Sequence, residues 1–326
     1  MTATALQVSR RGDDVFSLLS SAFPSARRWR LLLEQPLDPR RFDAIRGALL
    51  AYIAAVTDAP GPLTEAQACE RLLERRSDLV NYTRGGMLAP TREHTLEFNV
   101  LHRSLVRALS EFALEPHVDG IDLPVNVRLV YGDVDEDRAR APFSSTKLHS
   151  DVWAGVPADA AVCVLPVLGD IDNITIECFE MERELELSGM RAMNDYDEGL
   201  GIEPKLGYSD CSMKHGHLYV ADARLLHKTV RRKRSGVRLS LDFRFRYGDL
   251  DYRKLLPAIE RGGPDSVDTR VPFARWQEVG SDTLIVFDDT LADLRQRKSA
   301  ASSPVNTASY QLLPLTPLAG RSSERP

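Results

Sequence analysis

Three residues in the middle of the chain, His149, Asp151 and His227, are of the types that bind a divalent transition metal. His149 and Asp151 are two positions apart, so on an extended strand their side chains would share a face and could reach one ion. His227 comes much later and supplies a second imidazole. Two histidines and one carboxylate leave neighbouring positions of an octahedral iron(II) open, as an oxygenase requires. Taken singly, each residue is more often a surface or hydrogen-bonded side chain.

The segment 237–246 adds a partner to this set of ligands. Its apolar and polar residues alternate, which predicts a strand with one buried face and one charged face. The charged face must be directed at water or at a polar cavity, and the pattern alone does not separate the two. In a cavity, Arg238 could bind the distal carboxylate of 2-oxoglutarate through two parallel hydrogen bonds, with the Ser240 hydroxyl adding a third. In water, Arg238 and Asp242 would simply pair.

The order of these features favours the cavity, and it predicts a non-haem iron(II) site that uses 2-oxoglutarate and O2. In that chemistry the 2-oxo acid binds iron through its C1 carboxylate and keto oxygen. Its oxidative decarboxylation to succinate and carbon dioxide generates an oxidant that removes hydrogen from a substrate C–H bond. The protein's share is to position and shield that oxidant.

The elements that must position these residues change in type along the chain. Before about residue 120, apolar residues return every three or four positions, which predicts helices. One stripe covers 42–56, a second follows a capping box at 64–67, and a third comprises Leu96, Val100, Leu105, Leu109 and Phe112. From Leu123 the period changes to two. Short apolar runs then predict the strands of a β-sandwich or barrel, at 123–130, 161–168, 174–179, 217–221 and 237–246.

We therefore expect a mainly β fold with flanking helices (α+β) in three parts. Residues 1–120 form N-terminal helices packing on the barrel, 121–250 the catalytic core, and 251–326 a C-terminal extension that is partly loosely ordered. Within the extension we expect a short element at 283–287 and a helix at 289–297. The run 310–318 is expected to dock either on a partner subunit, as in a homodimer, or over the site.

Four motifs carry a resemblance to a known family. They are Asn126-Val127-Arg128, the run Lys147–Trp153, Pro166 followed by Asn173–Glu177, and Arg238–Arg244. Over residues 123–247 the chain resembles the iron(II)/2-oxoglutarate dioxygenases related to phytanoyl-CoA hydroxylase. Within that group it is similar to the enzymes of aminoglycoside biosynthesis clusters of the streptomycin and hygromycin type.

The resemblance implies a double-stranded β-helix (jelly roll, cupin-like) and a role for each matched residue. His149, Asp151 and His227 would hold iron(II), and Arg238 and Ser240 would hold 2-oxoglutarate. Arg128 would be a further pocket residue on the cosubstrate side, and Asn173 and Glu177 would lie in the substrate pocket. Trp153 would form an apolar wall against a substrate ring if the strand continued past Asp151, or else be a plain core tryptophan.

The substrate implied by the resemblance is an aminoglycoside or sugar intermediate in antibiotic biosynthesis, oxidised by hydroxylation or by an oxidative ring closure such as orthoester formation. Two alternatives stay open. The same chemistry could act on another bacterial metabolite, such as an amino acid or lipid. A cupin-like barrel could instead use its metal for sugar isomerisation, or only bind a sugar.

Composition narrows the range of partners. A net charge of −5 and a sequence pI near 5.9 favour neither nucleic acid nor an anionic membrane, and mildly favour a cationic substrate such as an aminosugar. The acidic runs 133–137 and 195–198 would attract such a substrate if they flanked the site, or would be solvated turns, and the basic run 231–234 is expected to be a hairpin turn.

No apolar run reaches the roughly 20 residues of a membrane span, and no secretory signal is visible, so we expect a cytoplasmic protein. Four dispersed cysteines predict reduced thiols.

Overall fold

The computed structural model describes residues 16–247 with short gaps, together with three strands at 275–278, 283–287 and 310–314. The expected helix at 289–297 and residues 134–137 of the first acidic run lie outside the described residues. No described helix is long and apolar enough to cross a membrane. The gaps are at 18, 84, 115, 124, 134–138, 157–159, 182–191, 203–205 and 209.

The helices before residue 110 begin where the sequence offers caps. In α2 (Pro39–Val56) the Asp38 carboxylate accepts from the backbone N–H of Arg41, and Pro39 occupies the first turn, where its missing N–H costs nothing. In α3 (Glu65–Glu74) the expected capping box forms between Thr64 and Gln67. The described residues of this region also include the short 3-10 helix η1 (Ser20–Ala22) and α4 (Thr95–Leu109).

The buried face of α4 differs from the expected stripe. Leu96 and Val100 are 72% and 48% exposed, whereas Phe98 and Leu101 are fully buried. Leu105 and Leu109 are buried as expected. The first turns of the helix are therefore rotated relative to the stripe, because Phe98 and Leu101 continue the Leu105 row at three- and four-residue spacing, whereas Val100 is five residues before Leu105.

Antiparallel strands make up most of the rest. A nine-stranded sheet, the major sheet, has the order β1-β2-β9-β6-β11-β4-β12, with β5 also paired to β11 and β3 to β5. Its members are β1 (Arg27–Arg28), β2 (Leu32–Pro36), β3 (Met87–Leu88), β4 (Val118–Leu123), β5 (Asn126–Tyr131), β6 (Ala160–Gly169), β9 (His217–Asp222), β11 (Val237–Tyr247) and β12 (Arg275–Glu278).

The expected N-terminal part contributes strands as well as helices. Strand β2 pairs with β9, and β3 pairs with β5. Neither short strand has the clear two-residue alternation that the later strands show. The helices before residue 120 are thus tied into the major sheet by their own connecting segments.

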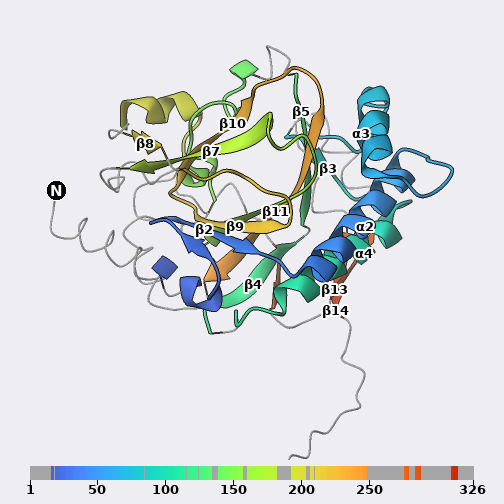
Figure 1. Ribbon diagram of the computed structural model, residues 1–326, viewed down its shortest axis with the longest axis horizontal. Coiled ribbons are helices and arrows are strands. Elements are labelled where there is room, and N and C mark those ends of the chain that lie inside the picture. Colours follow the sequence, from blue (N-terminus) through green and yellow to red (C-terminus); the bar gives the residue numbers. More distant parts are fainter. Residues whose placement is uncertain are drawn as a thin grey trace, which may run out of the picture.

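A three-stranded sheet, the minor sheet, has the order β10-β7-β8. It comprises β7 (Ile174–Met181), β8 (Leu206–Tyr208) and β10 (Leu226–Arg231). Arg231 ends β10, and residues 232–234 of the basic run lie in the connection from β10 to β11. The expected hairpin turn was wrong, because these two strands belong to different sheets. Gly236 in this connection has φ 92°, which glycine adopts readily. Figure 1 shows α2 and α4 on one side of the molecule and β7, β8 and β10 on another, with β9 and β11 between them.

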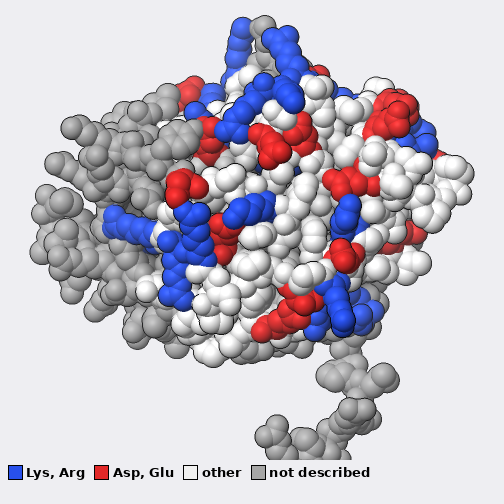
Figure 2. Space-filling view, in the orientation of Figure 1, with Lys and Arg blue, Asp and Glu red and all other residues white. Residues whose placement is uncertain are grey.

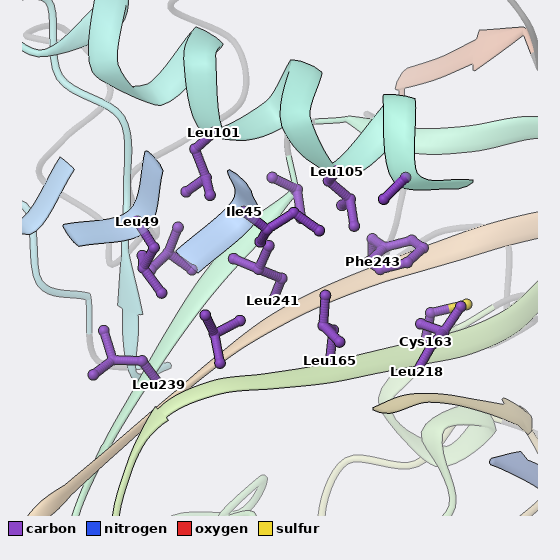
Figure 3. Packing of buried hydrophobic residues seen from close by; sticks show 14 of the residues in the cluster. Ile45, Leu49, Leu101, Leu105, Cys163, Leu165, Leu218, Leu239, Leu241 and Phe243 are labelled. Carbon is purple, nitrogen blue, oxygen red and sulfur yellow. The ribbon is translucent and has the colours of Figure 1, made fainter. Parts of the chain in front are cut away.

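The main core lies between the helices and the major sheet. In Figure 3, Ile45 and Leu49 of α2 and Leu101 and Leu105 of α4 point toward Leu241 and its neighbours on β11 and β6. The apolar residues of β11 (Val237, Leu239, Leu241, Phe243 and Phe245) are all 0–1% exposed in this core. The opposite, charged face of β11 must therefore face the minor sheet.

The Arg238 end of that charged face is enclosed, whereas Asp242, Arg244 and Arg246 further along the strand are partly exposed. Arg238 is 3% exposed and Ser240 is fully buried. A second apolar cluster joins Leu32 and Tyr219 of the major sheet to Cys178 of the minor sheet, so the two sheets pack face to face. Arg238 and Ser240 thus lie between the two sheets, in the region that we call the chamber.

The C-terminal strands β13 (Thr283–Phe287) and β14 (Tyr310–Pro314) form an antiparallel pair. The short element expected at 283–287 is this strand β13. Contacts with α4 place β13 on the helical side of the molecule, where both strands appear in red in Figure 1. Within the described residues, 310–314 therefore pair with the chain's own β13, and the rest of the run 310–318 is not described.

Candidate active site

The structure brings His149, Asp151 and His227 together. One ligand atom from each lies within 4.8 Å of the others, and the Nε2 of His227 is 3.7 Å from a carboxylate oxygen of Asp151. His149 is 5% exposed, and the other two side chains are partly buried. This arrangement can hold one metal ion with two imidazoles and a carboxylate.

The backbone achieves this convergence differently from the expected strand. His149 and His227 face each other in an isolated antiparallel bridge, with N–H to O distances of 3.0 and 2.8 Å in the two directions. Asp151 lies on no strand; it begins the 3-10 helix η2 (Asp151–Ala154), which ends at Gly155 with φ 87°. The Ser150 hydroxyl donates to the carbonyl of Ala223 at 2.7 Å and fixes the start of this turn. The expected shared strand face was therefore wrong, and a turn delivers the carboxylate instead.

Both imidazoles are oriented by the backbone. The Nδ1 of His149 lies 2.8 Å from the carbonyl of Lys147, and the Nδ1 of His227 lies 3.1 Å from the carbonyl of Leu225. Donation from Nδ1 to these carbonyls leaves each Nε2 as a lone pair for a metal, the usual arrangement of metal-binding histidines. Burial, and then the neighbouring His227, lower the pKa of His149 to about 3, which keeps that ring neutral.

A tyrosine that the sequence did not single out completes the surroundings of His149. The Tyr196 ring stacks on the imidazole with centroids 4.2 Å apart and an angle of 13°. Tyr196 begins the 3-10 helix η4 (Tyr196–Ile202) and is 5% exposed. Lys147 donates to the two aspartates on either side of Tyr196, Asp195 at 2.8 Å and Asp197 at 2.6 Å.

The second acidic run, 195–198, therefore does lie beside the metal ligands. Its aspartates are not free to attract a cation, because Lys147 engages two of them. The only sequence signal for this contact was that the run and Lys147 carry opposite charges. Because nearly fifty residues separate Lys147 from this run, the sequence gave no reason to pair the two.

Trp153 belongs to a packed apolar cluster beside the site. It is 1% exposed and shares this cluster with Val152, Phe179 and Tyr196, among others. Because η2 replaces the expected strand, Trp153 does not continue the face of His149 and Asp151. The structure thus favours the core tryptophan over the substrate wall.

Arg238 has the features of a carboxylate-binding residue. Its Nη1 makes a single long hydrogen bond, 3.4 Å to the carbonyl of Ile174, and its buried Nε has no hydrogen-bond partner among the described residues. Burial lowers the pKa of Arg238 to about 10, so the guanidinium is still charged at neutral pH. A buried charge with so few partners is costly unless an anion joins it. The residues present therefore fit the distal carboxylate of 2-oxoglutarate.

Ser240, Asp242 and Arg128 form a hydrogen-bonded group next to Arg238. The Ser240 hydroxyl donates to one oxygen of Asp242 at 2.8 Å, and the Nε of Arg128 donates to the other at 2.8 Å. Although burial alone would lower it, Asp242 raises the pKa of Arg128 above its ordinary value. Ser240 thus orients Asp242. Because Asp242 already has two partners, it is poorly placed to pair with Arg238 as well. Asp242 is a member of the site that sequence reasoning named only as an alternative partner of Arg238.

Asn173 lies at the Arg238 end of the chamber and away from the metal ligands. Its side-chain amide donates to both carboxylate oxygens of Asp170, at 2.8 and 2.9 Å. It precedes Ile174 of β7, whereas His227 is paired with Cys178 further along that strand. Five residues of strand correspond to about 17 Å. The structure does not bring Asn173 together with the metal ligands.

Glu177 lies on the other face of the minor sheet. It is the strand partner of Lys228, while the adjacent pair Cys178 and His227 face the chamber. Its carboxylate lies 3.1 Å from Arg232 and 3.7 Å from Lys228. Since neighbouring strand residues alternate in direction, Glu177 is directed away from the metal ligands.

No family model matches this chain, and no curated protein sequence matches it. Several solved structures are similar at low identity. AviO1 from Streptomyces viridochromogenes Tue57 is 12% identical over 71% of this chain and 94% of its own, with a TM-score of 0.37. A non-heme alpha ketoglutarate dependent epimerase, SnoN from nogalamycin biosynthesis, is 12% identical over 71% and 82%, with a TM-score of 0.32. An N-substituted L-amino acid dioxygenase from Burkholderia ambifaria AMMD is 12% identical over 72% and 91%, with a TM-score of 0.35. At this level of similarity the interpretation of the site depends on its own geometry.

Proposed function

We propose that the chain is a non-haem iron(II) oxygenase that uses 2-oxoglutarate and O2 to oxidise a C–H bond of a small metabolite. The observation that carries this proposal is the buried guanidinium of Arg238, which has one long hydrogen bond and an Nε without a described partner. A metal site alone would suit many activities. A metal site that shares an interior chamber with such an arginine fits a dicarboxylate cosubstrate.

Each of the chain's residues then has a defined task. His149, Asp151 and His227 hold iron(II), and Arg238 binds the distal carboxylate of 2-oxoglutarate. Bound iron and 2-oxoglutarate together would supply the oxidising power for the reaction. Asp242 places Arg128 beside the chamber, and the buried rings of Trp153 and Tyr196 restrict water on the metal side.

The proposal extends to the fold and to the substrate. Two facing antiparallel sheets with the ligands between them support a double-stranded β-helix, with residues 121–250 as the catalytic core. Of the two substrate types that the resemblance implies, we propose the sugar intermediate of antibiotic biosynthesis, with hydroxylation or oxidative ring closure as the outcome.

The test is cosubstrate binding and turnover. Anaerobic protein with iron(II) and 2-oxoglutarate should show a visible charge-transfer band, and addition of O2 should release succinate. Arg238→Met should bind 2-oxoglutarate about 100-fold more weakly, because it removes the one partner of a buried carboxylate. Its metal affinity should stay within about threefold of the wild type, since Arg238 is no ligand.

Arg232→Met is the matched control. Arg232 comes directly after β10, and its guanidinium pairs with Glu177 on the face of the minor sheet that is directed away from the metal ligands. This variant should bind 2-oxoglutarate as the wild type does. Unchanged affinity in Arg238→Met, or a wild type that binds metal yet never forms succinate, would contradict the proposal and favour a cupin-like isomerase or sugar-binding protein.

A further inference from the structure

A second arginine, Arg244, lies on the same charged face of β11 as Arg238. It is the strand partner of Val162, which packs against the cluster containing Trp153 and Tyr196. Arg238 and Arg244 are six residues apart on one strand, so their Cα atoms are about 20 Å apart. The four C–C bonds of 2-oxoglutarate span at most about 6 Å. Since the proposed function assigns the distal carboxylate of 2-oxoglutarate to Arg238 and its other end to the metal, the cosubstrate has no carboxylate left for Arg244.

The hydrogen bonding of Arg244 leaves one edge of its guanidinium open. Nη1 donates to Asp122 at 2.7 Å, and Asp122 is itself 6% exposed. The Nε of Arg244 is buried and has no hydrogen-bond partner among the described residues. Nε and Nη2 together form the edge that binds a carboxylate through two parallel hydrogen bonds. Asp122 occupies the other end of the group and leaves this edge available.

The Tyr196 hydroxyl is a second open donor in the same region. Its ring is buried on His149, and no hydrogen bond of its hydroxyl to a described residue is formed. Burial, and then Asp151, raise the pKa of Tyr196, whereas Arg128 and Arg244 lower it. Tyr196 belongs to the apolar cluster against which Val162, the strand partner of Arg244, packs, so Tyr196 and Arg244 lie in the same region.

We propose that the open edge of Arg244 and the hydroxyl of Tyr196 bind a carboxylate of the organic substrate, at the end of the chamber opposite Arg238. The inference rests on the proposed function, because it assigns Arg238 to 2-oxoglutarate and Arg244 to the substrate. It makes the substrate a carboxylic acid. A polycationic aminosugar would place ammonium groups against Arg244 and Arg128, where like charges repel.

Matched pairs of small molecules test the subsite directly. The protein is loaded with Zn(II), which does not support turnover, and with saturating 2-oxoglutarate. Binding of four acids and their primary amides is then measured by calorimetry: hippurate, 3-phenylpropionate, cyclohexanecarboxylate and pyroglutamate. At least one acid should bind roughly tenfold or more tightly than its amide, as expected for a charge-assisted bidentate contact.

Variants test which residues cause the tighter binding of an acid than of its amide. Arg244→Leu should bind acid and amide equally while its 2-oxoglutarate affinity stays within about twofold of the wild type. Tyr196→Phe keeps the ring on His149 and should lower the acid preference about threefold, which gives a result even if Arg244→Leu does not fold. Arg232→Leu, on the outer face of the minor sheet, is the matched control and should keep the full preference.

The outcomes separate the two proposals. If no acid binds better than its amide, or if the preference survives in both Arg244→Leu and Tyr196→Phe, the carboxylate subsite is overturned while the oxygenase assignment stands. If Arg244→Leu loses 2-oxoglutarate binding and Arg238→Met does not, the two arginines have the opposite roles, and this inference is again overturned. If the wild type binds no 2-oxoglutarate, the proposed function itself fails.

Discussion

Lys147 connects the metal ligands to a segment far away in sequence. Its ammonium group holds Asp195 and Asp197, and its own carbonyl accepts from His149. The residue between the two aspartates, Tyr196, lies on the His149 ring. One lysine thus orients a ligand directly through its backbone and indirectly through the stacked tyrosine.

We predict that Lys147→Met lowers the metal affinity of the site about tenfold, the lower end of the effect of losing a supporting partner of a ligand. The cause is that Asp195 and Asp197 would be released and the Tyr196 ring would no longer be fixed on His149. Co(II) titration followed by absorbance measures the affinity, and hydrogen exchange of 192–202 reports the release.

Lys233→Met is the control for this variant, because Lys233 is exposed in the β10–β11 turn. Faster exchange of 192–202 at unchanged Co(II) affinity would show that Tyr196 does not position His149.

At the scale of residues, the convergence of His149, Asp151 and His227 could be predicted, because chemistry restricts metal ligands to few residue types and these three are close in type and order to a known pattern. Tyr196 and Lys147 could not, because aromatic stacking and ion pairs between distant segments leave no periodic signal. The face on which Glu177 lies could not be predicted for another reason. Its neighbour Cys178 faces the chamber, and a shift of one residue along a strand reverses the side on which a side chain lies.

Strand β11 was the best predicted element, because strict alternation over eleven residues fixes both its type and its two faces. The turn at Asp151 could not be predicted in this way. A tripeptide is compatible with a strand or with the start of a 3-10 helix, and the tertiary contacts of Ser150 and Val152 with the Ala223 carbonyl decide between them. Short elements thus depend on partners that only the folded chain supplies.

Helix η4 depends on a close approach to Trp153. A Cβ atom at Gly199 would lie 2.3 Å from the Trp153 ring, a distance that real contacts do not reach. We predict that Gly199→Ala destabilises the protein by roughly 1–3 kcal/mol, as overpacking of a filled core does. Because Tyr196 is in the same helix, metal affinity should fall as well. Chemical denaturation and Co(II) titration measure the two effects.

Gly47→Ala is the matched control for that substitution. Gly47 lies on the exposed side of α2, and an added Cβ there meets nothing within 4 Å. Alanine should stabilise this helix by roughly 0.5–1 kcal/mol. If both alanine variants are equally stable, the packing of Gly199 on Trp153 is not what holds η4.

Charge of both signs is mixed on the face of the molecule that Figure 2 shows, among the described residues. Figure 2 shows basic and acidic side chains interspersed over the face in view. The net charge of −5 therefore says little about the site, where Arg238 is buried and the side chains of Arg128 and Arg244 are 31% and 26% exposed and each paired with an aspartate. Composition suggested a cationic substrate, whereas we propose an anionic one from the unpartnered Nε atoms of Arg238 and Arg244, because a buried donor acts on a ligand far more strongly than dispersed surface charges do.

Residues from both sheets meet at the site, so ligand binding there should stabilise the whole molecule. His227 comes from the minor sheet, Arg238 from the major sheet, and His149 and Asp151 from the segment that bridges to β10. Metal and 2-oxoglutarate should each bind only when the sheets are packed together. Any ligand that binds the folded state alone stabilises it, by about 2.7 kcal/mol at 100 times its Kd.

We therefore predict that Zn(II) raises Tm by about 5 °C at that concentration, and that 2-oxoglutarate raises it further only when Zn(II) is present. His227→Ala should abolish both shifts, since it removes the minor sheet's ligand. Arg238→Met should keep the first shift and lose the second. His117→Ala is the control and should keep both shifts, because the His117 imidazole contacts Ser21 and is far from the ligands in the sequence. A 2-oxoglutarate shift that survives in His227→Ala would mean that the dicarboxylate binds without the metal, and the shared site between the sheets would have to be abandoned.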